Sequence, residues 1–153
     1  MEKLKCPSQN CTTTKQLYRL LDLGLKANTA DMCYVSIKDS YMLSGNSYEL
    51  ESKYEKIVSG LKCMPAWSLH RLMCLCPGLI VHHEYKNDMS LSVNQVGVYY
   101  EDCYSYSDKY TECFDRHENI YDNMIDCIEW LIHNKYFDIE YLNEEEKSLS
   151  ENP

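Results

Sequence analysis

The fold is decided by the stretch IYDNMIDCIEWLI, which covers residues 120–132. Its apolar side chains recur every three or four positions and therefore share one face of a helix: Ile120, Met124, Ile125, Ile128, Leu131 and Ile132. The acidic residues Asp122, Asp126 and Glu129 fall on the other side. The pattern predicts a long amphipathic helix whose apolar face packs against the core of the protein.

Three short runs before this helix are typical of strands. They cover residues 79–85, 89–93 and 96–101. Because the turn-forming pairs Asn87-Asp88 and Asn94-Gln95 separate them, we predict a three-stranded meander. On its first strand, the neighbours His82 and His83 would face opposite sides of the sheet. Residues 102–118 are polar and lack a clear period, so we expect a loop there.

The N-terminal region predicts a helix with defined ends. Thr13 and Gln16 have the spacing of a capping box, in which each side chain satisfies a free backbone N–H group of the other residue. An apolar stripe of leucines follows, and Gly24 is typical of the residue that ends a helix. We also expect Asp138 to cap a final helical turn near the C-terminus.

A hairpin and further helices are predicted between these regions. A turn over 30–32, capped by Thr29, leads into strands at 33–37 and 41–43. A weaker helical pattern covers residues 47–60. Another helix is expected to begin at Pro65 and to end before Pro77-Gly78, with an apolar stripe made of Leu69, Leu72, Met73 and Cys76.

These elements together predict an α+β fold. We expect a small antiparallel sheet, made of the hairpin plus the three-stranded meander, that three to four helices cover. A length of 153 residues, 44% hydrophobic and 25% charged, suits one globular domain over residues 1–142, followed by a flexible acidic tail at 143–153. No run is apolar enough for a membrane helix or a signal peptide, so we expect a cytoplasmic protein without a membrane partner.

Charge is unevenly distributed along the chain. Residues 1–97 contain 11 basic and 9 acidic residues, whereas residues 98–153 contain 4 basic and 15 acidic residues. An acidic half repels the phosphate backbone of nucleic acids, where Lys and Arg supply most of the affinity. We therefore expect no nucleic-acid partner and favour a basic protein instead.

The acidic half also holds a cluster of tyrosines, a residue type that is enriched at protein interfaces. We predict that these tyrosines and the acidic residues beside them form a partner-binding surface. The predicted surface consists of Tyr99, Tyr100, Glu101, Asp102, Tyr104, Tyr106, Asp108, Tyr110 and Glu112. The alternative interpretation of the same residues is a solvated strand end followed by a loop.

The nine cysteines do not form a pattern typical of a metal site. Cys74 and Cys76 are separated by one residue, whereas structural zinc sites use pairs separated by two to four residues. At a helix end, one of these two thiols would lie on the apolar stripe and the other would point away. We therefore expect buried cysteines, no metal and no other cofactor.

Common catalytic and phosphate-binding motifs are missing from the sequence, which favours a protein that is not an enzyme. One alternative is a protein that sequesters a nucleotide-like signalling molecule in an aromatic pocket, with a homodimer interface as one place for it. That pocket would use Trp67, His70, Arg71, Arg19 and Lys62. The other alternative is a small hydrolase whose site would use Cys113, His117 or His70.

Three motifs resemble those of a family of small proteins from gut Bacteroidetes and their phages. The motifs are PAWSLHRL at 65–72, TADM at 29–32 and DNMIDCIEWL at 122–131. The resemblance covers segments 7–34, 64–77 and 120–142 and carries no activity or catalytic residue. It implies a phage or mobile-element accessory protein that acts inside the bacterial host cell. Such a protein is expected to bind and counteract a host factor, such as a host-defence component, or a small signalling ligand.

Overall fold

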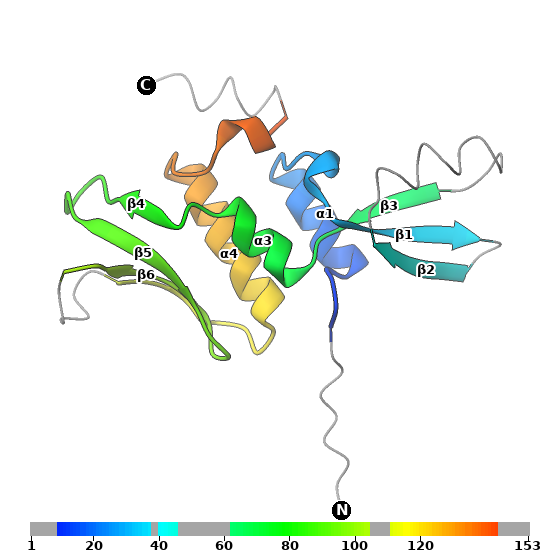
Figure 1. Cartoon of the computed structure of the whole chain (residues 1–153), viewed down its shortest axis with the longest axis horizontal. Helices are drawn as coiled ribbons and strands as arrows, with labels where there is room; N and C mark the ends of the chain where they lie inside the picture. Colours follow the sequence, from blue (N-terminus) through cyan, green and yellow to red (C-terminus); the bar gives the residue numbers. More distant parts are fainter. Residues whose placement is uncertain (1–8, 38–39, 46–61, 105–110, 144–153) are drawn as a thin grey trace, which may run out of the picture.

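The structure is a computed structural model that describes residues 9–37, 40–45, 62–104 and 111–143. The α-helices of the described residues lie in the middle of the molecule, and two antiparallel sheets lie on opposite sides of them (Figure 1). The α+β class predicted from the sequence is confirmed, although the strands form two separate sheets. The helix predicted over 47–60 and the tail from residue 144 lie outside the described residues.

The long amphipathic helix is confirmed as α4 (Ile120–His133). It begins at Asn119, whose side chain accepts a hydrogen bond from the backbone N–H of Tyr121 and so satisfies one free donor of the first turn. One face of α4 is buried against the rest of the core. That face consists of Tyr121, Asn123, Met124, Ile125, Cys127, Ile128 and Leu131.

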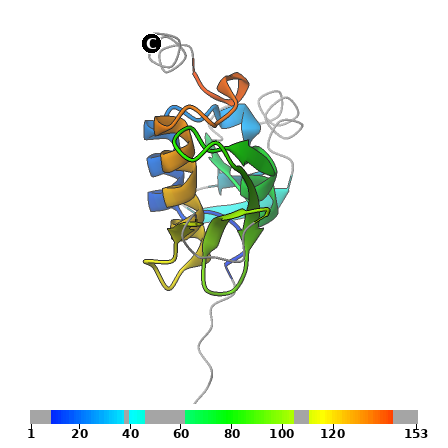
Figure 2. The same cartoon turned by 90° about the vertical axis from the view of Figure 1, so that its left-hand side faces the viewer.

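Helix α1 (Thr14–Asp22) begins at the predicted capping box. The backbone N–H of Thr13 donates to the Gln16 side chain at 3.0 Å, and the N–H of Gln16 donates to the Thr13 hydroxyl at 3.4 Å. After the helix, Gly24 has a φ of 86°, a left-handed conformation that costs glycine little. Figure 2 shows α1 beside α4, on the side of the molecule away from the strands.

Helix α3 (Leu69–Leu75) is shorter than predicted, because Pro65 belongs to a strand. Ser68 caps the helix by accepting a hydrogen bond from the N–H of Arg71 at 3.0 Å. Pro65 lies in β3 (Lys62–Ala66), which is an edge strand of the three-stranded sheet. An edge strand tolerates proline, since the N–H on its outer side has no ladder partner to lose.

The predicted hairpin is confirmed as β1 (Met32–Ile37) and β2 (Ser40–Gly45), and the order of this sheet is β2-β1-β3. The predicted turn over 30–32 is wrong. Thr29 instead ends a short 3₁₀ helix (Ala27–Thr29), where its hydroxyl donates to the carbonyl of Lys26 at 2.7 Å. Asp138 does cap the last turn (Ile139–Tyr141), as predicted.

The predicted meander is part of a four-stranded sheet with the order β4-β5-β6-β7. Its strands are β4 (Leu79–Val81), β5 (Asp88–Val93), β6 (Val98–Asp102) and β7 (Thr111–Phe114). The loop predicted over 102–118 is therefore wrong where β7 lies. The first strand ends at Val81, so His82 and His83 lie at the following turn and do not face opposite sides of a strand.

The buried core joins the helices to both sheets. Trp67 and Tyr100 are its largest fully buried side chains, and leucines and isoleucines of α1, α3 and α4 pack around them. The C-terminal end of the described chain returns to α1, because the N–H of Asn143 donates to the carbonyl of Gly24 at 2.8 Å. None of the helices in the described ranges has the length and apolar character needed to cross a bilayer.

Candidate functional site

The four-stranded sheet presents one face to α4 and the opposite face, here called the outer face, away from it. Along β6 the burial alternates: Val98 and Tyr100 are buried, whereas Glu101 is exposed. Because paired residues of neighbouring strands point to the same side, the register extends the outer face across the sheet. It contains Leu79, Val81, Asp88, Ser90, Ser92, Tyr99, Glu101, Thr111 and Cys113.

The outer face combines apolar and acidic side chains. Leu79 is 57% exposed and Val81 is 55% exposed. Glu101 and Asp88 are its charged residues, and the sheet and its connections carry seven acidic and two basic residues within the described residues 79–104 and 111–118. In Figure 1, α4 lies on one side of this sheet, and none of the described helices or strands lies on the other.

The tyrosine-rich surface predicted from the sequence is placed only in part on this face. Tyr99 is half-buried there, and Tyr104 follows β6 with 81% of its surface exposed. Asp102 lies at the end of β6 and accepts a hydrogen bond from the N–H of Tyr104 at 2.8 Å. Tyr106, Asp108 and Tyr110 lie outside the described residues.

Two residues of the predicted surface point inward, and their assignment to it is corrected. Tyr100 is fully buried, and its hydroxyl donates to the carbonyl of Pro77 at 2.6 Å. Burial also raises the pKa of the Tyr100 phenol far above its ordinary value. Glu112 pairs with Tyr100 across the strands, and its carboxylate lies 3.6 Å from Nε2 of the buried His82.

A second feature is a cavity of about 460 Å³ between α4, α1 and β7, here called the α4 groove. Four residues of α4 at helical spacing line it, which places them on one stripe of the helix. Arg19 contributes from α1, and Glu112 to Phe114 contribute from β7. The full lining consists of Arg19, Glu112, Cys113, Phe114, Arg116, Asp126, Glu129, Trp130, His133 and Asn134.

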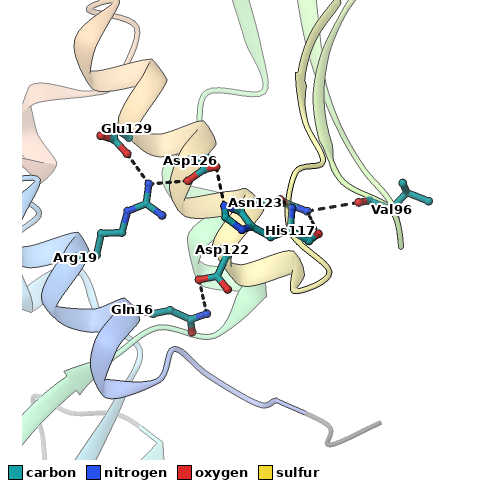
Figure 3. A network of polar contacts seen from close by, with 8 residues as sticks. All are labelled: Gln16, Arg19, Val96, His117, Asp122, Asn123, Asp126 and Glu129. Atoms are coloured by element: carbon teal, nitrogen blue, oxygen red, sulfur yellow. Dashed lines mark hydrogen bonds and ion pairs between the residues drawn. The ribbon is translucent and has the colours of Figure 1, made fainter. Parts of the chain in front are cut away.

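Polar contacts tie α1 to α4 beside this groove (Figure 3). The Arg19 guanidinium donates to Asp126 at 2.6 Å and to Glu129 at 2.5 Å. The other oxygen of Asp126 lies 3.1 Å from the ring nitrogen Nε2 of His117. One turn earlier, the Gln16 amide donates to Asp122 at 2.8 Å. Both carboxylates at Arg19 are therefore already engaged within the protein.

Asn123 anchors two connections of the sheet to α4 and was not singled out from the sequence. It is buried, and its side-chain oxygen accepts a hydrogen bond from the N–H of His117 at 2.9 Å. Its amide donates to the carbonyl of His117 at 2.9 Å and to that of Val96 at 3.5 Å (Figure 3). The available signal was a polar residue within the apolar face of a helix, where a buried amide needs partners.

The residues predicted for an aromatic ligand pocket are not brought together. Trp67 is fully buried, and its indole N–H donates to the Thr29 hydroxyl at 3.0 Å, so its assignment to a ligand wall is wrong. Arg71 donates to the carbonyl of Thr29 at 2.6 Å. Of the five predicted residues, Arg19 lines the α4 groove, His70 is exposed on α3, and the side chain of Lys62 lies outside the described part.

The side chains considered for a hydrolase have separate partners. Nε2 of His70 lies 3.6 Å from the thiol of Cys74, whereas His117 faces Asp126. Partial desolvation of the sulfur and the neighbouring Asp115 raise the pKa of the Cys113 thiol, although the side chain as a whole is exposed. A nucleophilic cysteine needs the opposite shift, because the thiolate is the reactive form.

Cys74 lies on α3 and is exposed, whereas Cys76 follows the helix with an extended backbone and is buried. All eight cysteines of the described ranges are free thiols. Across those same ranges, no three His, Cys, Asp or Glu side chains are grouped so that they could hold a metal ion.

Comparisons with protein-family models, with curated proteins and with solved structures each gave no match. The function of the outer face and of the α4 groove therefore has to follow from their own geometry and charge.

Proposed function

We propose that this chain is a non-enzymatic binding protein and that the outer face of the β4–β7 sheet contacts a basic protein partner. The observation that carries the proposal is the exposure of Leu79 and Val81 on a sheet face that no described element covers. Adjacent exposed apolar side chains with a polar rim are typical of interaction sites.

The chemistry of the face supports a basic partner. Tyr99 and Tyr104 supply rings that combine an apolar body with a polar tip, the type of side chain that interfaces favour. Asp88 and Glu101 lie on the face itself. A surface with this charge speeds the encounter with a positively charged protein and disfavours an acidic one.

The same charge argues for a different protein and against a second copy of this chain. In a two-fold dimer each patch meets itself, so the acidic residues of two outer faces would come close together. Like charges placed together at an interface cost several kcal/mol. The partner proposed here is a host factor, specifically a host-defence component, and this part rests on the resemblance to small phage-associated proteins.

The test is capture of partners from a bacterial host lysate on the immobilised chain. Wild type is expected to retain a basic protein that elutes as salt is raised, because rim charges are screened by ions. Leu79→Ser and Glu101→Lys should each reduce the amount retained. Asp22→Lys is the matched control: it makes the same change in charge as Glu101→Lys, at the exposed end of α1.

Equal capture by wild type and both outer-face variants would refute the proposed surface. Light scattering on the purified chain gives an independent check. A dimer that Glu101→Lys disrupts would show that a second copy occupies the face, contrary to the proposal.

A further inference from the structure

We infer that the α4 groove binds a small planar anion, whose ring stacks on Trp130 and whose oxyanion is held by Arg116 and His133. This site does not depend on the proposed protein partner, and it borders the outer face at Cys113, which belongs to both. Its volume of about 460 Å³ falls within the range of about 300 to 1,000 Å³ that is usual for small-molecule sites.

The carboxylates that line the groove already have partners within the protein. Asp126 has one oxygen on Arg19 and the other near His117, and Glu129 also receives the Arg19 guanidinium. Glu112 faces the buried His82. Each carboxylate of the lining thus has a positively charged or donating neighbour, and an added cation would have to displace it.

Two donor side chains of the groove, in contrast, have no partner among the described residues. Arg116 and His133 are exposed and line the groove. Among the described residues, neither side chain has a hydrogen-bond or ion-pair partner. A guanidinium offers five N–H donors in a fork that matches a carboxylate or a phosphate group. The unused hydrogen-bonding capacity of the groove therefore suits an oxyanion.

Trp130 supplies an aromatic wall to the groove. Trp130 is half-buried and lines the groove one helical turn from His133. Its ring packs among other rings, with the ring centroids of Tyr136, Phe114, Tyr100 and His82 at 5.3, 5.7, 6.0 and 6.4 Å. A ring that is already fixed loses little entropy when another ring stacks on it. Stacking of this kind tolerates many planar partners.

The carboxylates of the site limit how much negative charge the bound anion can carry. Glu112, Asp126 and Glu129 surround the two free donors with three carboxylates. A polyphosphate would meet this negative potential directly, whereas the Arg116 guanidinium, with a ring N–H of His133 as a second donor, can hold one phosphate or carboxylate group. The ligand class is therefore a planar ring that bears a single phosphate or carboxylate group.

The experiment is calorimetric titration of the full chain with two probes, adenosine monophosphate and indole-3-acetate. If only adenosine monophosphate binds saturably, the preferred oxyanion is a phosphate. If only indole-3-acetate binds, it is a carboxylate. Either outcome supports the site. Arg116→Gln is expected to weaken binding about tenfold, the loss typical of one hydrogen bond to a charged group. Lys15→Gln removes the same charge from the exposed surface of α1 and should leave affinity unchanged.

A footprint on cysteines locates the ligand independently. Cys113 lines the groove and is exposed, and Cys74 and Cys103 are exposed elsewhere. Bound probe should slow the alkylation of Cys113 by iodoacetamide and leave the other two rates unchanged. The inference is overturned if neither probe binds at about 1 mM, if Lys15→Gln weakens binding as much as Arg116→Gln, or if Cys113 is not protected.

Discussion

Replacing Asn123 with alanine is expected to loosen the attachment of the four-stranded sheet to α4. The side chain makes two hydrogen bonds of 2.9 Å to the backbone of His117 and a longer one of 3.5 Å to Val96. A net contribution of about 1 kcal/mol for each short bond, with a smaller one for the long bond and for the lost packing, gives a loss of about 2 to 3 kcal/mol. For a chain of this size, that loss lowers the melting temperature by about 4 to 12 °C.

The assay is urea unfolding followed by circular dichroism. The midpoint should fall while the m-value stays the same, since the variant exposes the same surface on unfolding. Hydrogen exchange at the amide of His117 should become faster in Asn123→Ala, because that N–H donates to the Asn123 side chain. Asn28→Ala, at an exposed position, is the control and should change stability by no more than about 0.5 kcal/mol.

Asn123→Asp separates hydrogen bonding from side-chain volume. The carboxylate has nearly the same shape and still accepts from His117, but it loses both donors and places a charge beside the carbonyls of His117 and Val96. It should destabilise the protein at least as much as Asn123→Ala at neutral pH. A loss below about 0.5 kcal/mol in either variant would refute the assignment of Asn123 as an anchor.

Three further predictions follow from other parts of the fold. Gly97→Ala should lower the free energy of unfolding in urea by about 1 to 3 kcal/mol, because an added Cβ would lie 2.7 Å from the carbonyl oxygen of Phe114. Gly78→Ala is the control, since a Cβ there meets nothing within 4 Å. An equal loss in both variants would contradict the explanation. Arg19→Met should cost only about 1 kcal/mol or less, since its side chain is 38% exposed, and a larger loss would show a stronger coupling of α1 to α4. Burial and the neighbouring thiol raise the pKa of Tyr34 to about 12 from an unfolded value of 10.0. The stability from this group is therefore complete below pH 10 and is lost as pH rises through 12, so Tyr34→Phe should flatten the pH dependence of unfolding in that window.

Local chemistry explains why several elements were predictable from the sequence. The capping box of Thr13 and Gln16 depends on residues three apart, and the face of α4 depends on a period that the chain itself carries. In each case the interacting groups are neighbours along the chain, so no information about distant segments is required.

Long-range pairing explains the elements that were missed. Proline is compatible with a first helical turn and with an edge strand. Pro65 lies in a strand because its segment pairs with β1, where it is opposite Cys33. Residues 111–114 carry no strand signal of their own, and they form β7 because β6 supplies a partner. The α4 groove likewise joins residues that are about one hundred positions apart, such as Arg19 and Asp126.

The sequence by itself determined helices α1 and α4, the caps at Thr13 and Asp138, the α+β class and the acidic second half of the chain. Only the tertiary structure decided which side chains of that half are accessible. Tyr99 and Tyr100 are the same residue type at adjacent positions, yet Tyr100 is fully buried and Tyr99 lies on the outer face. The physical reason is that a strand alternates its side chains between two faces, and the packing of α4 against one face determines which of them is removed from water.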